Sequence, residues 1–242
     1  MAESQSNNAV ARLAPDAASR VRMIVQSAAS IILWMAACFG GAGRLDWWRG
    51  WTSFAIYAAV MGVTGFVVER FNPGLLRVRG KWQRGNTASF DRVFIALFLP
   101  LTLGQPLVAG LDAVRFRWLP LAAWTAVPGV LLFVMGMALI TWSLAVNPFA
   151  ESTVRLQTDR GQKVIRQGPY QVIRHPMYAG MLLMYPGTGL MLGSGWALAL
   201  SALTAVLVAW RTGREDEFLQ RSLAGYREYA GHTRYRLAPG LW

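Results

Sequence analysis

Two groups of polar residues in an otherwise apolar chain have the types and spacing that chemistry requires. The first is the stretch GPYQVIRHPMY, residues 168–178, in which Arg174 and His175 precede Pro176. Proline suits the first turn of a helix, so His175 and the free backbone N–H groups of that turn would lie together at a helix N-terminus. With Arg174 beside them, these groups could bind an anion. The alternative is that the tyrosines and the arginine only anchor a helix at the membrane surface.

The second group is RTGREDEFLQ, residues 211–220, which begins where the last apolar run ends. Arg211 and Glu215 are four residues apart, so they would share one face of a helix. An ordinary salt bridge would explain this pair, although Arg before Glu is the weaker order for that purpose. Glu215 and Asp216 could instead bind a cation and Arg211 an anion, because ionisable groups at a membrane edge are candidates for function.

Several other kinds of site are not expected from the sequence. The chain has one cysteine, Cys38, and two histidines, His175 and His232, so we predict no disulfide framework and no metal site built on these residues. The glycine-rich loops that bind nucleotides and the serine motif of hydrolases do not occur in it. The sequence also lacks the aromatic and basic patterns that are typical of nucleic-acid binding, so we expect no nucleic-acid partner.

Long apolar runs must position both polar groups. The chain has 242 residues, of which 54% are hydrophobic and 15% charged, whereas soluble domains carry about 25% charged residues. Runs of roughly 17–25 apolar residues can cross a bilayer as helices. We therefore predict an all-α membrane protein with about six spans, near residues 22–43, 51–69, 92–111, 118–146, 177–193 and 195–210. The last two, separated only by Gly193-Ser194-Gly195, should form a tight helical hairpin. Pro100 and Pro106 should kink the third or make it partly re-entrant.

Basic residues are unevenly distributed between the two sides of such a bundle. Of the 24 Lys and Arg residues, 20 lie in the segments 1–22, 69–92, 147–176 and 211–242, which six spans would place on one side. The positive-inside rule then predicts that both termini lie in the cytoplasm, and we expect a bacterial inner membrane. The same distribution, together with attraction to anionic lipid, accounts for the net charge of +12.

The chain would divide into three parts. Residues 1–21 are polar and should be disordered. They lack the apolar core and cleavage site of a signal peptide, so the first span is expected to be retained. Residues 22–140 would form the N-terminal transmembrane helices, and residues 141–242 would hold both polar groups.

Taken in order, the motifs of residues 140–242 resemble the isoprenylcysteine carboxyl methyltransferase family and the wider group of phospholipid-methyltransferase-like membrane proteins. They are Gly168-Pro169-Tyr170, Arg174-His175-Pro176-x-Tyr178-x-Gly180, Arg211-x3-Glu215-Asp216-x2-Leu219, Gly225-Tyr226-x2-Tyr229 and Pro239. The first four predicted spans carry none of these motifs. One position departs from the family pattern, since the usual acidic pair is Glu-Glu and Asp216 has the shorter reach.

The resemblance implies that the chain binds S-adenosylmethionine at the cytoplasmic face and methylates a lipid or lipidated acceptor in the membrane. The cofactor site that it implies comprises Gly168, Tyr170, Arg174, His175, Pro176, Tyr178, Gly180, Glu215 and Asp216. Arg211 and Glu215 would be catalytic. The acceptor would bind at Arg211, Trp142, Asn147, Phe149 and Tyr226, with Tyr185 as a further apolar wall.

The choice of acceptor depends on whether a proton must be removed. A carboxylate needs only a cation to orient it, whereas an amine must lose a proton to a base. The sequence offers Arg211 more plainly than a base, which favours O-methylation of a carboxylate over N-methylation of a phospholipid or another amine. Two alternatives stay open. One is a membrane reductase that binds the 2′-phosphate of NADPH through Arg155, Arg160, Lys163 and Arg166, and the other is a lipid-binding protein without enzymatic activity. The sequence does not define an oligomeric state.

Overall fold

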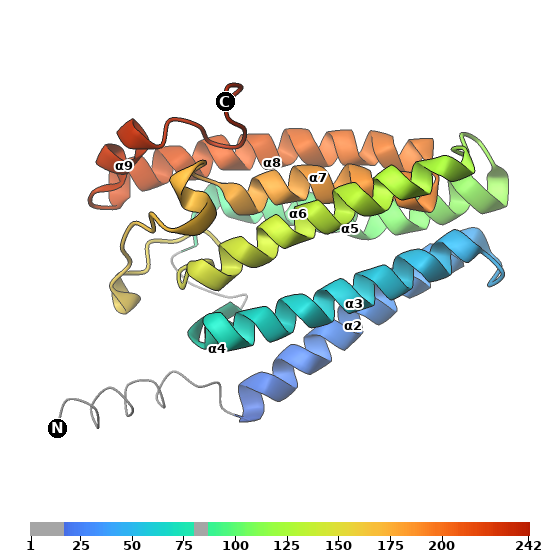
Figure 1. Cartoon of the computed structure of the whole chain (residues 1–242), viewed down its shortest axis with the longest axis horizontal. Coiled ribbons are helices and arrows are strands. Elements are labelled where there is room, and N and C mark those ends of the chain that lie inside the picture. The colour runs from blue at the N-terminus through green and yellow to red at the C-terminus, as the bar shows by residue number, and fades with distance from the viewer. Residues whose placement is uncertain (1–16, 80–86) are drawn as a thin grey trace.

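The computed structural model describes residues 17–79 and 87–242, and the regular elements in these two ranges are all helical, as predicted (Figure 1). Residues 1–16, which hold most of the segment expected to be disordered, lie outside the described ranges. The helices are α2 (Ala17–Ala42), α3 (Trp48–Phe71), α4 (Pro73–Arg79), α5 (Ser89–Gly110), α6 (Ala126–Val146), α7 (Pro176–Leu192), α8 (Gly195–Ser222) and α9 (Tyr226–His232), with a π-helical turn at Leu111–Phe116 and 3-10 turns at Ala123–Thr125, Thr158–Arg160 and Gly168–Gln171.

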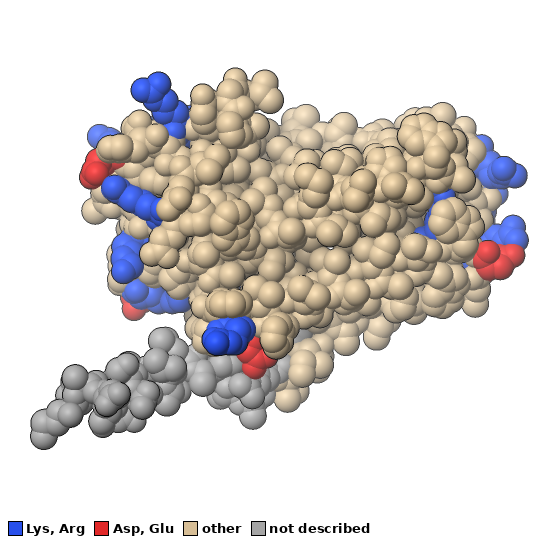
Figure 2. Space-filling model, viewed as in Figure 1, with Lys and Arg blue, Asp and Glu red and all other residues tan. Residues whose placement is uncertain are grey.

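Five of these helices are long and apolar enough to cross a membrane. They are α2 from Ile24, α3, α5 with its π-helical turn, α6 with the preceding 3-10 turn, and α8, and their lengths run from 19 to 28 residues. Figure 2 shows Lys, Arg, Asp and Glu mainly near the two ends of the visible face, with a broad uncharged band between them. Such a band matches the hydrocarbon core of a bilayer, so the chain is an integral membrane protein.

Helix α7 corresponds to the sixth predicted span. It has 17 residues, about 26 Å at a rise of 1.5 Å per residue, and it runs beside α6 and α8 in Figure 1. Gly193, with a φ of 79°, ends α7, and the hydroxyl of Ser194 caps α8 by accepting from the Ala197 N–H at 3.0 Å. The predicted tight hairpin is therefore present. A sixth crossing by α7 and the cytoplasmic placement of both termini stay predictions.

Glycines bring α6 and α7 into close backbone contact. A Cβ atom on Gly136 would lie 2.5 Å from the carbonyl oxygen of Gly180, and one on Gly180 would lie 2.6 Å from the carbonyl oxygen of Gly136. Gly129 and Gly187 meet the facing backbone in the same way, with nearest atoms at 2.4 and 2.5 Å. Small residues permit this approach between membrane helices. The contact fixes the start of α7, and hence His175, against α6. The predicted boundary between residues 140 and 141 falls within α6.

The fourth predicted span begins later than the composition suggested. Residues 118–122 are not helical, and regular helix begins only at Ala123. The reason is a backbone contact with the α7–α8 turn. The Leu121 N–H donates to the Gly193 carbonyl at 2.8 Å, and the Gly195 N–H donates to the Leu119 carbonyl at 3.0 Å.

Helix α8 carries the chemistry-bearing residues beyond its apolar run. It continues without a break from Gly195 to Ser222, and Gly225, with a φ of 77°, then turns the chain into α9. The C-terminal segment returns to the start of α7, where the N–H groups of Arg174 and His175 donate to the carbonyls of Tyr235 and Arg236, both at 2.9 Å. Residues 147–175, α9 and the end of α8 thus gather at one end of the bundle, here called the polar end (Figure 1).

Candidate active site

A cavity of about 100 Å³, partly open to the outside, lies at the polar end. We call it the polar cavity. Glu151, Arg155 and Tyr229 line it. Many of the predicted site residues line it as well, namely Asn147, Phe149, Tyr170, Arg174, His175, Tyr178, Arg211, Glu215 and Tyr226. The fold therefore joins the two polar groups of the sequence in one pocket.

A larger cavity of about 630 Å³, the apolar cavity, lies between the helices, within the 300–1,000 Å³ typical of small-molecule sites. Helices α2 to α8 all contribute to it, and its apolar lining includes Met61, Val68, Phe94, Phe98, Met137 and Met181. Glu151, Met177 and Arg211 line both cavities. These three residues mark the place where the two cavities meet, and we call them the junction.

Asp216 organises the wall of the polar cavity without lining it. Its carboxylate is fully buried and accepts from Arg174 Nε at 2.8 Å and Arg174 Nη2 at 3.0 Å. Gln220, Tyr226 and Arg236 also donate to it, at 2.8, 3.0 and 3.0 Å. Because a buried carboxylate is costly unless it is paired, this set of donors is what keeps Asp216 in place. Arg174 also donates to the carbonyls of residues 233 and 234, at 2.8 and 2.7 Å.

His175 is held beside this cluster at the N-terminus of α7. Its Nε2 lies 3.2 Å from Asp216 Oδ1 and 3.4 Å from the hydroxyl of Tyr226. Its ring stacks on that of Tyr178, with ring centres 5.7 Å apart. Burial and the nearby Asp216 charge raise the pKa of Tyr226 well above its usual range, so the hydroxyl stays protonated and can donate. The imidazole is thus fixed in orientation while it lines the polar cavity.

Glu215, one residue before Asp216, has different surroundings. It is half-buried, lines the polar cavity and accepts a short hydrogen bond from the hydroxyl of Tyr178. Within the described ranges, no basic side chain lies within salt-bridge distance of its carboxylate. An acid that faces a pocket without a basic partner is suited to binding a cation.

The opposite wall of the polar cavity is built around Tyr170. Its hydroxyl accepts from Asn147 Nδ2 at 2.9 Å, and its carbonyl accepts from the hydroxyl of Tyr229 at 2.6 Å. Burial raises the pKa of Tyr170 above its usual range, because the phenolate would lose its hydration. Asn147 also accepts from the N–H of Phe149 at 2.9 Å, which fixes the turn that carries the Phe149 ring to the cavity.

Arg211 is held at the junction by an acid that the sequence analysis did not single out. Asp91, in the first turn of α5, is fully buried and accepts from Arg211 Nε at 2.8 Å and Nη2 at 2.7 Å. The other Asp91 oxygen accepts from the Val154 N–H at 2.8 Å. The guanidinium lies over the rings of Phe94 and Tyr178, 4.3 and 5.1 Å from their centres. One of only two acids among the basic residues of the segment 69–92, Asp91 was the available signal.

Comparison with known proteins gives a match to the part of the chain that forms much of the polar cavity. Residues 124–225 match the family described as phospholipid methyltransferase. The predicted resemblance is further confirmed by similarity to protein-S-isoprenylcysteine O-methyltransferase B of Arabidopsis thaliana, at 31% identity over 83 residues. A protein of Oryza sativa subsp. indica named probable protein-S-isoprenylcysteine O-methyltransferase is 35% identical over 83 residues. The alignments cover 32% of this chain, which spans 40% and 41% of the length of these two relatives.

Most of the basic residues near the polar cavity form ion pairs. Arg155 Nε and Nη2 donate to Glu151 at 2.8 and 2.9 Å, and Arg155 Nη1 donates to Asp159 at 2.6 Å. These hydrogen bonds, first that to Glu151, raise the pKa of Arg155. Arg160 also pairs with Glu151, at 3.5 Å, and Arg166 pairs with Glu228 at 3.2 Å.

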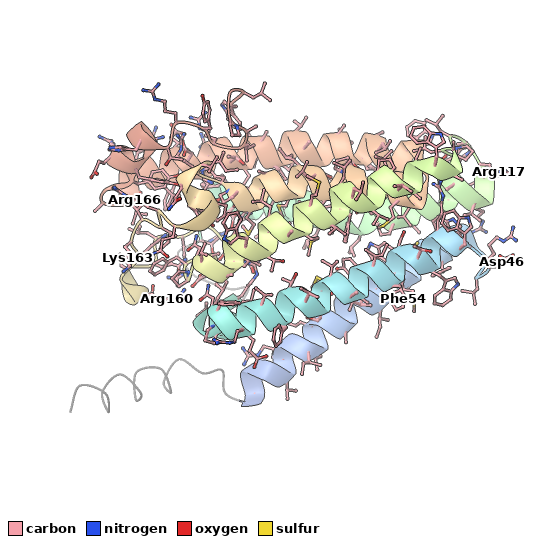
Figure 3. The ribbon with its side chains drawn as sticks, viewed as in Figure 1. Asp46, Phe54, Arg117, Arg160, Lys163 and Arg166 are labelled. Carbon is pink, nitrogen blue, oxygen red and sulfur yellow. The ribbon has the colours of Figure 1, made fainter. Side chains whose placement is uncertain are left out.

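This pairing bears on the reductase alternative. Figure 3 shows Arg160, Lys163 and Arg166 at the polar end. Of the four basic residues considered for a 2′-phosphate, Arg155, Arg160 and Arg166 already have acidic partners, and Lys163 lines the polar cavity. The arrangement therefore favours a cofactor other than NADPH.

Some predicted site residues lie within residues 124–225 without lining either cavity. Gly168 has a φ of 57° and lies beneath Trp142, and Trp142 is itself 53% exposed on the outer face of α6. Gly180 serves the contact between α6 and α7, and Pro176 is buried in the first turn of α7. Tyr185 is buried and hydrogen-bonded to Thr102 at 2.9 Å. Their expected contact with cofactor or acceptor stays a prediction.

Proposed function

We propose that the chain transfers a methyl group from S-adenosylmethionine to the carboxylate of a lipidated acceptor in the membrane. The observation that supports this proposal most strongly is the junction of the polar and apolar cavities at Glu151, Met177 and Arg211. A water-soluble donor and a membrane-embedded acceptor need separate compartments that meet at one point. Similarity to two relatives named isoprenylcysteine O-methyltransferases supports a thioether-linked lipid with a free carboxylate as the acceptor class.

The polar cavity has the groups that S-adenosylmethionine would need. Its sulfonium and ammonium are cationic, and Glu215 faces the cavity without a basic partner among the described residues. His175 and the N-terminal turn of α7 would hold the cofactor carboxylate or ribose. The rings of Phe149, Tyr170 and Tyr178 offer apolar surfaces for the adenine. When bound, the cofactor would supply an electrophilic methyl group whose bond to sulfur breaks as the bond to the acceptor oxygen forms.

The residues of the chain would act mainly by positioning. Arg211, held by Asp91 and by two aromatic rings, would orient the acceptor at the junction. Exclusion of water by the apolar cavity would strengthen that interaction. Since a carboxylate is already a nucleophile, no side chain needs to remove a proton. The cytoplasmic orientation of the polar end and a bacterial inner membrane belong to the same proposal.

The test is transfer of a labelled methyl group by the purified full chain in lipid vesicles. S-adenosylmethionine labelled in its methyl group would be supplied with an S-prenylated N-acetylcysteine as the acceptor. We expect a product that releases labelled methanol in mild alkali, as a carboxyl methyl ester does. Phospholipid label that stays non-volatile after alkali, on the headgroup amine, would indicate N-methylation instead. Absence of label in any lipid-soluble product would refute the proposal.

Two variants make the assay specific to the site. Glu215→Gln should weaken cofactor binding by about 1.5–3 kcal/mol, the scale of a charged hydrogen bond. Glu217→Gln is the matched control, because Glu217 lies on the same helix but pairs with Arg214 and Arg221 at the surface. The control should behave as the unmodified protein does.

A further inference from the structure

The buried charges around the junction pair with one another almost completely. Arg211 pairs with Asp91 at 2.7 Å, Arg155 with Glu151 at 2.8 Å, and Arg174 with Asp216 at 2.8 Å. Each of these arginines has an acidic partner of opposite charge, so the three pairs together carry little net charge. Arg211 in particular brings no uncompensated positive charge to an incoming acceptor.

Arg79, beside the apolar cavity, does not follow this pattern of paired charges. It is the last described residue of α4, is half-buried and lines the apolar cavity. Its Nη1 donates to the carbonyl of Ala150 at 2.7 Å. No carboxylate of residues 17–79 or 87–242 lies within salt-bridge distance of it. Burial and the nearby Arg211 charge lower the pKa of Arg79, which reflects the cost of a cation without an acidic partner.

A short strip of backbone, residues 150–152, places Arg79 beside the junction. Arg79 Nη1 donates to the carbonyl of Ala150, and the hydroxyl of Ser152 donates to the carbonyl of Arg79 at 3.1 Å. Arg211 Nη2 donates to the carbonyl of Ser152 at 3.4 Å. The middle residue of the strip, Glu151, lines both cavities and is held by Arg155. The two arginines therefore lie on the same strip, and Arg79 faces the apolar cavity.

The unbalanced charges complement the two proposed substrates. Glu215, without a basic partner in the described ranges, faces the polar cavity, and Arg79, without an acidic one, faces the apolar cavity. A cationic donor would be attracted to the first and an anionic acceptor to the second. Leaving a desolvated charge unpaired destabilises a fold, so such a charge suggests a ligand of opposite sign.

We propose that Arg79 binds the anionic group of the acceptor and gives the apolar cavity its preference for a carboxylate. This inference rests on the proposed function for the identity of the acceptor. Arg211, whose charge Asp91 balances, would add hydrogen-bond donors at the junction rather than net charge. Arg79 lies outside the sequence motifs and outside residues 124–225, so it would be a contribution of the N-terminal helices to the site.

The experiment compares two probes that differ only in charge. Binding of an S-prenylated N-acetylcysteine and of its carboxamide is measured with the full chain in phosphatidylcholine vesicles. The variants are Arg79→Gln, which removes the charge, and Arg79→Lys, which keeps it. Arg70→Gln is the matched control, because Arg70 is exposed at the end of α3 and lines neither cavity. Binding of S-adenosylmethionine is measured in each variant as a check on the fold of the polar cavity.

We expect the unmodified protein to bind the acid about 10- to 100-fold more tightly than the carboxamide, as a charged hydrogen bond implies. Arg79→Gln should bring the affinity for the acid down to that for the carboxamide and leave cofactor binding unchanged, whereas Arg79→Lys should keep most of the preference. A preserved preference in Arg79→Gln, or loss of both probes and the cofactor, would overturn the assignment. If Arg79→Gln loses the preference but no variant transfers methyl, the assignment stands and the proposed function fails.

Discussion

Replacing Asp216 by Asn should destabilise the fold, whereas replacing the adjacent Glu215 by Gln should not. Asp216 is fully buried and accepts two hydrogen bonds from Arg174 and one from Arg236, at 2.8 to 3.0 Å. Asn keeps one acceptor oxygen but removes the charge, which leaves Arg174 buried beside a neutral amide. Removing one partner of a buried ion pair costs about 3–5 kcal/mol. Because Arg174 keeps its bonds to two backbone carbonyls, we expect the lower end, about 3 kcal/mol.

The measurement is the unfolding midpoint of each variant in mixed micelles with increasing denaturing detergent. Asp216→Asn should unfold at a clearly lower detergent fraction, and Glu215→Gln should keep the midpoint of the unmodified protein while its affinity for S-adenosylmethionine falls. Asp216→Glu, which keeps the charge, should also lower the midpoint, because an extra methylene in a filled site costs typically 1–3 kcal/mol. An unchanged midpoint for Asp216→Asn would show that the ion pair with Arg174 does not hold the C-terminal segment against α7.

Three further outcomes follow from the packing and the charges. Arg211→Ala should leave the affinity for S-adenosylmethionine nearly intact and lower turnover at least about tenfold, and equal turnover would limit Arg211 to a structural role. Gly180→Leu should lower the unfolding midpoint, because its Cβ would lie 2.6 Å from the carbonyl oxygen of Gly136. Burial raises the pKa of Tyr229 to about 12, so its contribution to stability is present below the unfolded value near pH 10 and is lost as the pH rises to 12. The free energy of unfolding should therefore fall more steeply over that window than in Tyr229→Phe, and parallel curves would contradict this account.

The fold was predictable because apolar length alone determines which segments can cross a bilayer as helices. Composition could not locate the helix ends that depend on contacts with residues distant in sequence. The non-helical start of the fourth span depends on backbone bonds from residues 118–122 to the turn at Gly193, more than 70 residues away in sequence. The helix expected for Arg211 and Glu215 is present as the end of α8, which continues without a break to Ser222, because a change from apolar to polar residues marks the end of a membrane but not the end of a helix.

The site shows the same division between local and distant information. Arg211 and Glu215 could be selected from the sequence, because their spacing and their place at the end of an apolar run are local features. The partner of Arg211 could not be selected, since Asp91 lies 120 residues away and belongs to another helix. Arg79 and Glu151 were missed for the related reason that their importance lies in which charges remain paired or unpaired after folding.

Helical geometry explains why two adjacent acids have different surroundings. Successive residues on an α-helix point about 100° apart. Arg211 and Glu215, four residues apart, both line the polar cavity. The next face of α8 carries Asp216 and, four residues on, Gln220, which donates to it at 2.8 Å. That face meets the start of α7 and the returning C-terminal segment, where no solvent-exposed volume remains around Asp216. A short acid suits this filled position. Asp216 holds the wall of the cavity, whereas Glu215 faces its interior, and this difference explains why Asp occupies the second position in place of the usual Glu.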